Sequence, residues 1–159
     1  MAKKKENQAV KVIKKWEGFM PDPYLCPAGV PTIGYGNTMY ENGDRVAIDD
    51  CTVDRKRAEE ILLNFVKKVE AQVLEVVDVK LKAHQLAALT SFTYNVGIGN
   101  LMKSTLLIKV NNCVTDQNIP DEFRRWNKSK GKVLAGLTAR REDEAAIWIG
   151  EVWTYPTAD

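Results

Sequence analysis

The chain has 159 residues, of which 45% are hydrophobic and 28% are charged, as expected for a globular protein with ample material for a core. Its formal net charge of +2 is too small to indicate nucleic-acid binding. No apolar run reaches membrane-spanning length, and no apolar stretch follows the basic N-terminus, so we expect neither an integral membrane segment nor a signal peptide.

A first helix is predicted over residues 6–17, where apolar side chains recur at helical spacing: Ala9, Val10, Ile13, Trp16 and Met20. Glu17 falls beside this apolar stripe, and Gly18 directly after it favours a helix stop. A carboxyl group on the apolar side of a helix end is partly removed from water, which favours the protonated form that a general acid needs. The alternative is that Glu17 is an ordinary surface residue.

Residues 20–50 combine prolines, glycines and β-prone side chains, which together predict a small sheet. Thr32–Gly36 has the character of a strand. Asn42-Gly43 is a strong hairpin signal, so we expect Arg45–Ile48 to return as a partner strand.

A long helix is predicted over residues 53–77, with Thr52 as its N-cap. It either joins two lobes as a rod or covers a single core, and the sheet before it and helices after it favour the rod. The chain is helical from Ala83 onward, with Ser104 and Thr138 expected to cap later helices. We expect Trp153 and Tyr155 to fold back on the core.

The three cysteines, Cys26, Cys51 and Cys113, form no CxxC pair and no metal-site spacing. Their odd number and the lack of a secretory signal favour free thiols in a reducing cytoplasm, although the sequence leaves a Cys26–Cys51 bridge open. We expect no metal and no other cofactor.

Several of these stretches together resemble the phage-type lysozymes, endolysins that cut peptidoglycan. Glu17, Cys26 and Thr32 match that family's pattern of Glu, eight residues, Asp or Cys, five residues, Thr. The later motifs SFTYNVG, STLL, FRRW and GLTARRxxE extend the resemblance over residues 16–155.

The resemblance implies an α+β, mainly helical, two-lobed lysozyme-like fold. The chain would be a single domain over residues 1–159, with a small sheet lobe at about 18–52 and a connecting helix at about 53–77. The helical lobe would hold residues 78–159 together with the first helix.

The function that the resemblance implies is a muramidase. Such an enzyme hydrolyses the β-1,4 bond between N-acetylmuramic acid and N-acetylglucosamine in bacterial peptidoglycan and lyses the host. We expect a monomer that binds no nucleic acid, stays in the host cytoplasm until lysis and reaches the wall through a holin lesion. A lytic transglycosylase and a wall-binding protein with weakened catalysis remain alternatives.

In this family frame Glu17 is the catalytic acid, while the second catalytic role is open. Cys26 stands where many relatives carry Asp, and its thiolate would steer water or stabilise the oxocarbenium charge. Alternatively, the Thr32 hydroxyl positions the water and Cys26 helps it. Cys26 as a small buried residue and Asp22 as a second carboxylate are further alternatives.

Other site residues follow from their places in the family motifs. Thr38 is expected on the cleft side of the small lobe, and Tyr94 and Thr105 are expected to contact substrate from the large lobe. Arg140 or Arg141 is expected to pair with Glu17. Basic residues also cluster, for example at Lys128-Lys130-Lys132, either as solvated surface or as a match for an anionic polymer such as teichoic acid.

Overall fold

The computed structural model describes residues 6–151, so the predictions for Trp153 and Tyr155 lie outside the described residues. Helices dominate the described chain, and four short strands form two antiparallel hairpins. The elements are α1 (Gln8–Glu17), β1 (Met20–Leu25), β2 (Pro31–Gly34), α2 (Arg55–Val76), α3 (Ala83–Val96), α4 (Ile98–Lys103), α5 (Thr105–Asn112), α6 (Ile119–Arg124), β3 (Lys128–Ser129), β4 (Lys132–Val133) and α7 (Ala135–Trp148).

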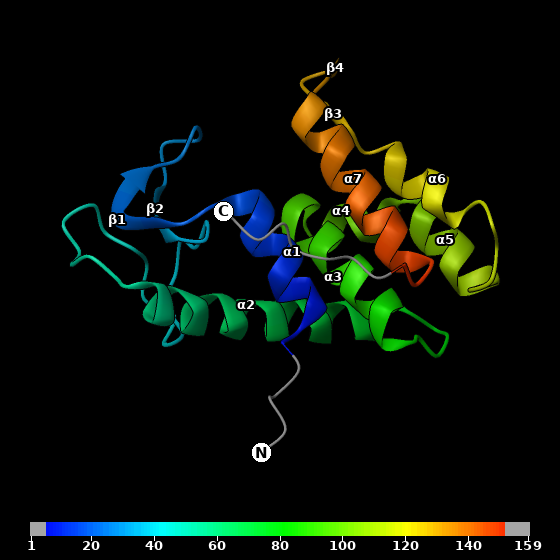
Figure 1. The fold of residues 1–159 in the computed structure, drawn as a ribbon, viewed down its shortest axis with the longest axis horizontal. Coiled ribbons are helices and arrows are strands. Elements are labelled where there is room, and N and C mark those ends of the chain that lie inside the picture. The colour runs from blue at the N-terminus through cyan, green and yellow to red at the C-terminus, as the bar shows by residue number, and fades with distance from the viewer. Residues whose placement is uncertain (1–5, 152–159) are drawn as a thin grey trace.

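The sheet region and the helical region lie at opposite ends of the molecule (Figure 1). The β1–β2 hairpin forms one end, α3 to α7 form the other, and α2 runs beneath both. Since α2 packs against β2 and also against α3, it physically connects the two regions. The expected α+β, mainly helical fold is therefore confirmed, while the lobe boundaries at about 18–52, 53–77 and 78–159 stay a prediction.

The core lies where α1, α2, α3 and α7 meet. Val10 and Ile13 of α1 are buried there, and α1 packs chiefly against α3. Phe92 of α3 meets Phe123 and Trp126 edge-on, with ring centroids 5.6 and 5.4 Å apart, a favoured geometry for aromatic pairs. This packing fixes α1, and with it the position of the helix end that carries Glu17.

Two of the expected helix caps are wrong and one is confirmed. Asp54, not Thr52, caps α2, since its Oδ1 accepts a hydrogen bond from the Arg57 amide at 2.7 Å. Thr138 lies inside α7, where its hydroxyl donates to the carbonyl of Leu134 at 3.2 Å. The Ser104 cap of α5 is confirmed by its bond from the Leu107 amide at 3.0 Å.

The strand expected at Arg45–Ile48 is also wrong, because only Arg45 pairs across the turn, in an isolated bridge to Met39. The Asn42-Gly43 turn itself is present, with Gly43 at φ +90°. Beyond Val46 the chain turns instead, because the Asp50 carboxylate accepts a hydrogen bond from the Ala47 amide at 2.8 Å.

Candidate active site

Glu17 is the last residue of α1, and its half-buried side chain is 24% exposed. Its Oε1 accepts a hydrogen bond from Arg140 Nη1 of α7 at 2.8 Å. Its Oε2 faces Gly36, just after β2, where an added Cβ would come within 3.0 Å of that oxygen. The acid therefore sits where α1, α7 and the sheet region meet, with a different neighbour for each oxygen.

Arg140 is itself held by buried partners. Its Nη2 donates to the carbonyl of Ser91 at 3.3 Å, and its Nε lies 3.3 Å from Glu144 Oε1. Glu144 is fully buried and accepts a second hydrogen bond from the Ser91 hydroxyl at 2.8 Å. Burial raises the pKa of Glu144, and the charges of Arg141 and then Arg140 oppose that rise. The arginine that holds the acid is thus itself positioned by a buried carboxylate.

Arg141 does not pair with Glu17, which corrects the sequence expectation that either arginine would. Its Nε lies 2.8 Å from Glu144 Oε2, its Nη2 donates to Asn95 Oδ1 at 2.9 Å, and its guanidinium lies over the Phe92 ring. Neighbouring helix positions point about 100° apart, so only one of the two arginines reaches the end of α1. A continuous polar chain therefore runs from Glu17 through Glu144 to Asn95.

Cys26 and Thr32 come together in the β1–β2 hairpin. Both the Cys26 amide, at 3.0 Å, and the Thr32 hydroxyl, at 2.9 Å, donate to the carbonyl of Val30. Hydrogen bonding from the backbone of Val30, and then of Ala28, lowers the pKa of the Cys26 thiol. The hairpin thus favours the thiolate form of Cys26.

Two residues of β1, Asp22 and Tyr24, differ in their surroundings. Asp22 is exposed and accepts a hydrogen bond from the Thr52 hydroxyl, as a surface turn residue would. Burial, and then the negative charge of Glu17, raise the pKa of the Tyr24 hydroxyl. Tyr24 is therefore a further candidate for the region around Glu17, beyond the site residues that the sequence predicts.

A cavity of about 280 Å³ lies between the end of β2, α2 and the end of α3. Tyr94 borders it and joins the two regions, because its hydroxyl donates to the carbonyl of Tyr35 and accepts from Asn37 Nδ2, each at 3.1 Å. Burial and the Glu17 charge raise the pKa of Tyr94. The lining residues are Gly36, Asn37, Thr38, Phe65, Val69, Gln72, Thr93, Tyr94, Gly97 and Ile98.

Thr38 and Tyr94 thus face one cavity, whereas Thr105 does not line it. Thr105 is the exposed first residue of α5. Gly36 both borders this cavity and contacts Glu17, so the cavity lies beside the acid.

A second cavity, of about 430 Å³, begins at the exposed end of α3 and reaches the β3–β4 hairpin. It is lined by Asn95, Val96, Asn100, Trp126, Lys128, Ser129, Leu134 and Leu137. Asn95 and Trp126 are candidate site residues that the sequence analysis did not predict. The signal was present, since Asn95 follows Tyr94 in SFTYNVG and Trp126 ends FRRW.

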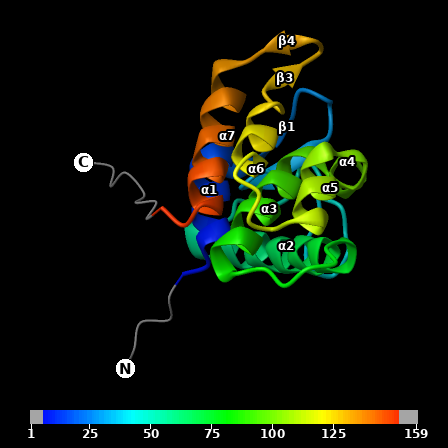
Figure 2. The same ribbon diagram turned by 90° about the vertical axis from the view of Figure 1, so that its right-hand side faces the viewer.

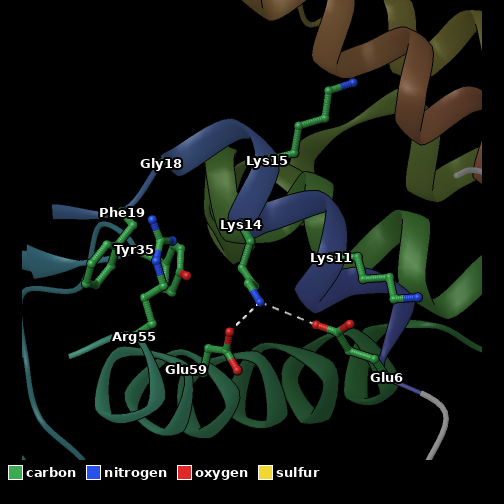
Figure 3. Close-up of a pocket in the computed structure, with 9 residues that line it drawn as sticks. All are labelled: Glu6, Lys11, Lys14, Lys15, Gly18, Phe19, Tyr35, Arg55 and Glu59. Atoms are coloured by element: carbon green, nitrogen blue, oxygen red, sulfur yellow. Dashed lines mark hydrogen bonds and ion pairs between the residues drawn. The ribbon is translucent and has the colours of Figure 1, made fainter. Parts of the chain in front are cut away.

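The largest of these cavities, about 550 Å³, lies on another face of α1 and does not include Glu17 (Figure 3). Lys14 sits between two carboxylates there, with its Nζ 2.5 Å from Glu59 and 3.5 Å from Glu6. Lys15 turns toward α7 and pairs with Asp143 at 2.7 Å. Since its charges are largely paired and it holds no catalytic candidate, size alone does not mark the active site.

No group of three or more histidine, cysteine, aspartate or glutamate side chains comes together as a metal site within residues 6–151. None of the helices described there has the length and apolar character needed to cross a membrane. The three cysteines, all within the described range, are free, so Cys26 and Cys51 form no bridge.

Comparison with known proteins gives matches over most of the chain. Residues 14–144 match the family model described as Phage lysozyme. The endolysin of Bacillus phage B103 is 36% identical over 146 residues, covering 88% of this chain and 52% of that relative. The endolysin of Salmonella phage P22 is 32% identical over 137 residues, covering 86% of this chain and 92% of the relative.

Solved structures of phage endolysins and lysozymes also match this chain. The endolysin from Escherichia coli O157:H7 phage FAHEc1 matches with a TM-score of 0.83 at 30% identity, covering 97% of this chain and 98% of that one. A mutant of P22 lysozyme matches with a TM-score of 0.79 at 29% identity, covering 94% and 99%. The chain spans about half the length of the two Bacillus phage endolysins it matches. With a family match over residues 14–144, the chain belongs to the phage lysozyme family.

Proposed function

We propose that the protein is a muramidase that hydrolyses the β-1,4 bond between N-acetylmuramic acid and N-acetylglucosamine in bacterial peptidoglycan. One observation carries this proposal: Glu17 is half-buried, with Oε1 bonded to Arg140 and Oε2 facing Gly36. Arg140 fixes the orientation of the carboxyl group, which leaves Oε2 as the oxygen that delivers a proton. In the reaction, that proton passes to the glycosidic oxygen as its bond to the anomeric carbon breaks.

Thr32 is proposed to position the attacking water, and Cys26 is proposed to accept a proton from it. The Thr32 hydroxyl donates its own proton to the Val30 carbonyl, so its oxygen is left to accept a hydrogen bond from water. Accepting that bond increases the electron density on the water oxygen, which forms the new bond to the anomeric carbon. The Cys26 thiolate, favoured by the hairpin backbone, is the acceptor for the proton that the water loses.

The cavity beside Glu17 suits an N-acetylated sugar chain. Asn37 Oδ1 and Thr93 Oγ1 are buried without a hydrogen-bond partner in the described chain, and both residues line the 280 Å³ cavity. An acetamido group offers one donor and one acceptor to such atoms. Thr38 and Tyr94 line the same cavity and are proposed substrate contacts. Thr105, exposed on α5, is a proposed contact outside this cavity.

Trp126 gives the second cavity an aromatic side chain, which suits the apolar face of a sugar ring. We propose that the glycan lies along both cavities and that no metal or cofactor takes part. By family resemblance, the protein acts as a monomer without a nucleic-acid partner. It waits in the host cytoplasm and reaches the wall through a holin lesion, where cleavage lyses the cell.

A lytic transglycosylase is the second candidate, because Cys26 stands where a second carboxylate would serve hydrolysis. Such an enzyme needs a single acid and base and leaves an anhydro product. The endings of the released sugars distinguish the two reactions.

The test is product analysis by mass spectrometry of peptidoglycan digested with the parent protein and with Glu17→Gln. We expect reducing sugar ends from the parent and a loss of activity of about 100-fold or more in Glu17→Gln, which removes the proton donor while keeping the shape. Glu142→Gln, an exposed change on α7, is the matched control and should remain active. Full lysis by Glu17→Gln would exclude this mechanism, and anhydro ends from the parent would select the transglycosylase.

A further inference from the structure

The β3–β4 hairpin is a short arm that stands out beyond α6 and α7 in both views (Figure 1, Figure 2). It carries three exposed lysines, Lys128, Lys130 and Lys132. None of the three forms an ion pair with a carboxylate in residues 6–151. The arm is therefore a concentrated positive charge on a chain that is otherwise close to neutral.

The pairing register spreads this charge around the arm. Lys128 pairs with Val133 and Ser129 pairs with Lys132, so Lys128 and Lys132 project from opposite faces of the hairpin. Lys130 lies in the turn between them. A single anion in a fixed pocket would meet only one of these faces, whereas a flexible chain with repeated negative charges can contact all three lysines.

The turn itself holds a lysine in an uncommon conformation. Lys130 has φ +49° and Gly131 has φ +76°, and Lys130 is the only non-glycine residue with positive φ in residues 6–151. Asn or Gly would adopt this two-residue turn with less strain. Strain of this kind is often found where a side chain is used, and here it places a cation at the tip of the arm.

The arm adjoins the proposed sugar site. Lys128 and Ser129 line the 430 Å³ cavity together with Asn95 and Trp126. Asn95 is bonded to Arg141, at the far end of the polar chain that holds Glu17. In Figure 1 the arm stands at the top of the helical region, on the side away from α2. A polymer attached to a glycan in that cavity would pass beside the lysines.

We infer that the β3–β4 hairpin binds a linear phosphodiester polymer attached to peptidoglycan, such as teichoic acid. The inference rests on the proposed function and names a second wall component that the protein contacts. Ammonium groups on flexible stems suit phosphates that repeat along a mobile chain. Stem-peptide carboxylates are the competing ligand, and the experiment separates the two.

The probe is purified sacculi from a bacterium whose wall carries teichoic acid, used before and after hydrofluoric acid removes the polymer. Every protein carries Glu17→Gln, so that binding is measured by co-sedimentation without digestion and independently of catalysis. The test variant adds Lys128→Gln, Lys130→Asn and Lys132→Gln. Asn is favoured at the turn position, so this variant should fold as well as its parent.

The control variant removes the same charge elsewhere, through Lys56→Gln, Lys67→Gln and Lys80→Gln, all exposed positions outside the hairpin. We expect the hairpin variant to bind polymer-bearing sacculi about 10-fold more weakly than its parent at low salt, with a smaller difference at high salt. The control variant should bind like the parent, and all three proteins should bind stripped sacculi equally. Circular dichroism checks that the variants are folded.

Three outcomes would overturn the inference. Equal binding of the hairpin variant and its parent to polymer-bearing sacculi would show that the arm has no part in binding. The same loss on stripped sacculi would assign the lysines to peptide carboxylates. A matching loss in the control variant would show that only net charge matters. None of these depends on whether the glycan is hydrolysed, so failure here is distinct from failure of the muramidase proposal.

Discussion

The two oxygens of Glu17 meet different constraints, one polar and one steric. Arg140 supplies the polar one through its 2.8 Å hydrogen bond to Oε1. Gly36 supplies the steric one, since any side chain there would approach Oε2. The conformation of Gly36, with φ +81°, adds a second reason for glycine at this position.

We therefore predict that Gly36→Ala reduces activity more than its effect on folding explains. The added Cβ would lie 3.0 Å from Oε2 and push the carboxyl group from its place beside Arg140. Gly43→Ala is the matched control, because Gly43 also has positive φ, +90°, but an added Cβ meets nothing within 4 Å. Both variants should lose about 1 kcal/mol or more of unfolding free energy from backbone strain. Equal kcat values for the two would contradict the prediction.

Cys26 allows a prediction about pH. An ordinary cysteine thiol has a pKa of about 8.5. Because the hairpin backbone lowers the pKa of the Cys26 thiol, its thiolate should become populated at a lower pH than that of an ordinary thiol. Cys51→Ser with Cys113→Ser leaves Cys26 as the single thiol of the chain. The rate of iodoacetamide alkylation of this variant, measured against pH, should reach half its maximum below the midpoint found for free cysteine.

A midpoint at or above that of free cysteine would remove the argument for a thiolate. The activities of two variants then test whether the Cys26 side chain takes part in catalysis: Cys26→Asp should retain more activity than Cys26→Ala. An alanine variant as active as the parent would leave Thr32 as the residue that positions the water.

At the scale of elements, the sequence predicts where helices lie better than it predicts the residues at which they begin and end. The spacing of apolar residues predicts α1 and α2 closely, because one buried face determines both. The residue type of Thr52 predicts it as the cap of α2, but Asp54 has the position that reaches the Arg57 amide. Residue type alone does not decide which of two nearby capping residues, Thr52 or Asp54, forms the cap.

The β3–β4 hairpin was missed for a related reason. Lys130-Gly131 lacks the Asn-Gly or Asp-Gly signature, and lysines on both sides do not favour strands. Conversely, Asn42-Gly43 forms its turn without a following strand, because the Asp50 carboxylate bends the chain after Val46. A turn signal predicts a turn, and the pairing beyond it depends on contacts made elsewhere.

The cap of α2 offers a direct test at this scale. Asp54→Ala should lower the unfolding free energy by about 1 kcal/mol, because the Arg57 amide loses its partner. Thr52→Ala should cost less, since Thr52 bonds only to the exposed side chain of Asp22. Urea denaturation of both variants measures the difference. A larger loss for Thr52→Ala would mean that the helix begins earlier than described.

At the scale of the whole molecule, contacts between distant segments build the site. Glu17 and Arg140 are 123 positions apart in sequence, and Tyr94 reaches across to Tyr35 and Asn37. Family spacing predicts that Glu17, Cys26 and Thr32 share one region, but it cannot choose between Arg140 and Arg141. Nor does a Glu in a charged stretch, R-R-E-D-E, look like the centre of a buried network.

Glu144 is that centre, and its charge should matter for the whole fold. It joins Ser91 of α3 to both arginines of α7 from a fully buried position. Glu144→Gln keeps the shape but leaves two buried guanidinium groups without their shared carboxylate. Breaking a buried pair by removing one partner costs about 3–5 kcal/mol, a large part of the stability of a single domain.

We predict a loss of that size for Glu144→Gln in urea denaturation, against less than about 1 kcal/mol for Glu142→Gln, whose pair with Arg124 is exposed. Since Arg140 also holds Glu17, the folded fraction of the Glu144 variant should show a lower kcat with little change in KM. Glu144→Met fills a similar space with an apolar side chain that cannot orient Arg140, so kcat should fall there too. Stability and kcat both unchanged in Glu144→Gln would mean that the arginines are held by Ser91 and Asn95 alone, and that the acid needs no buried carboxylate behind it.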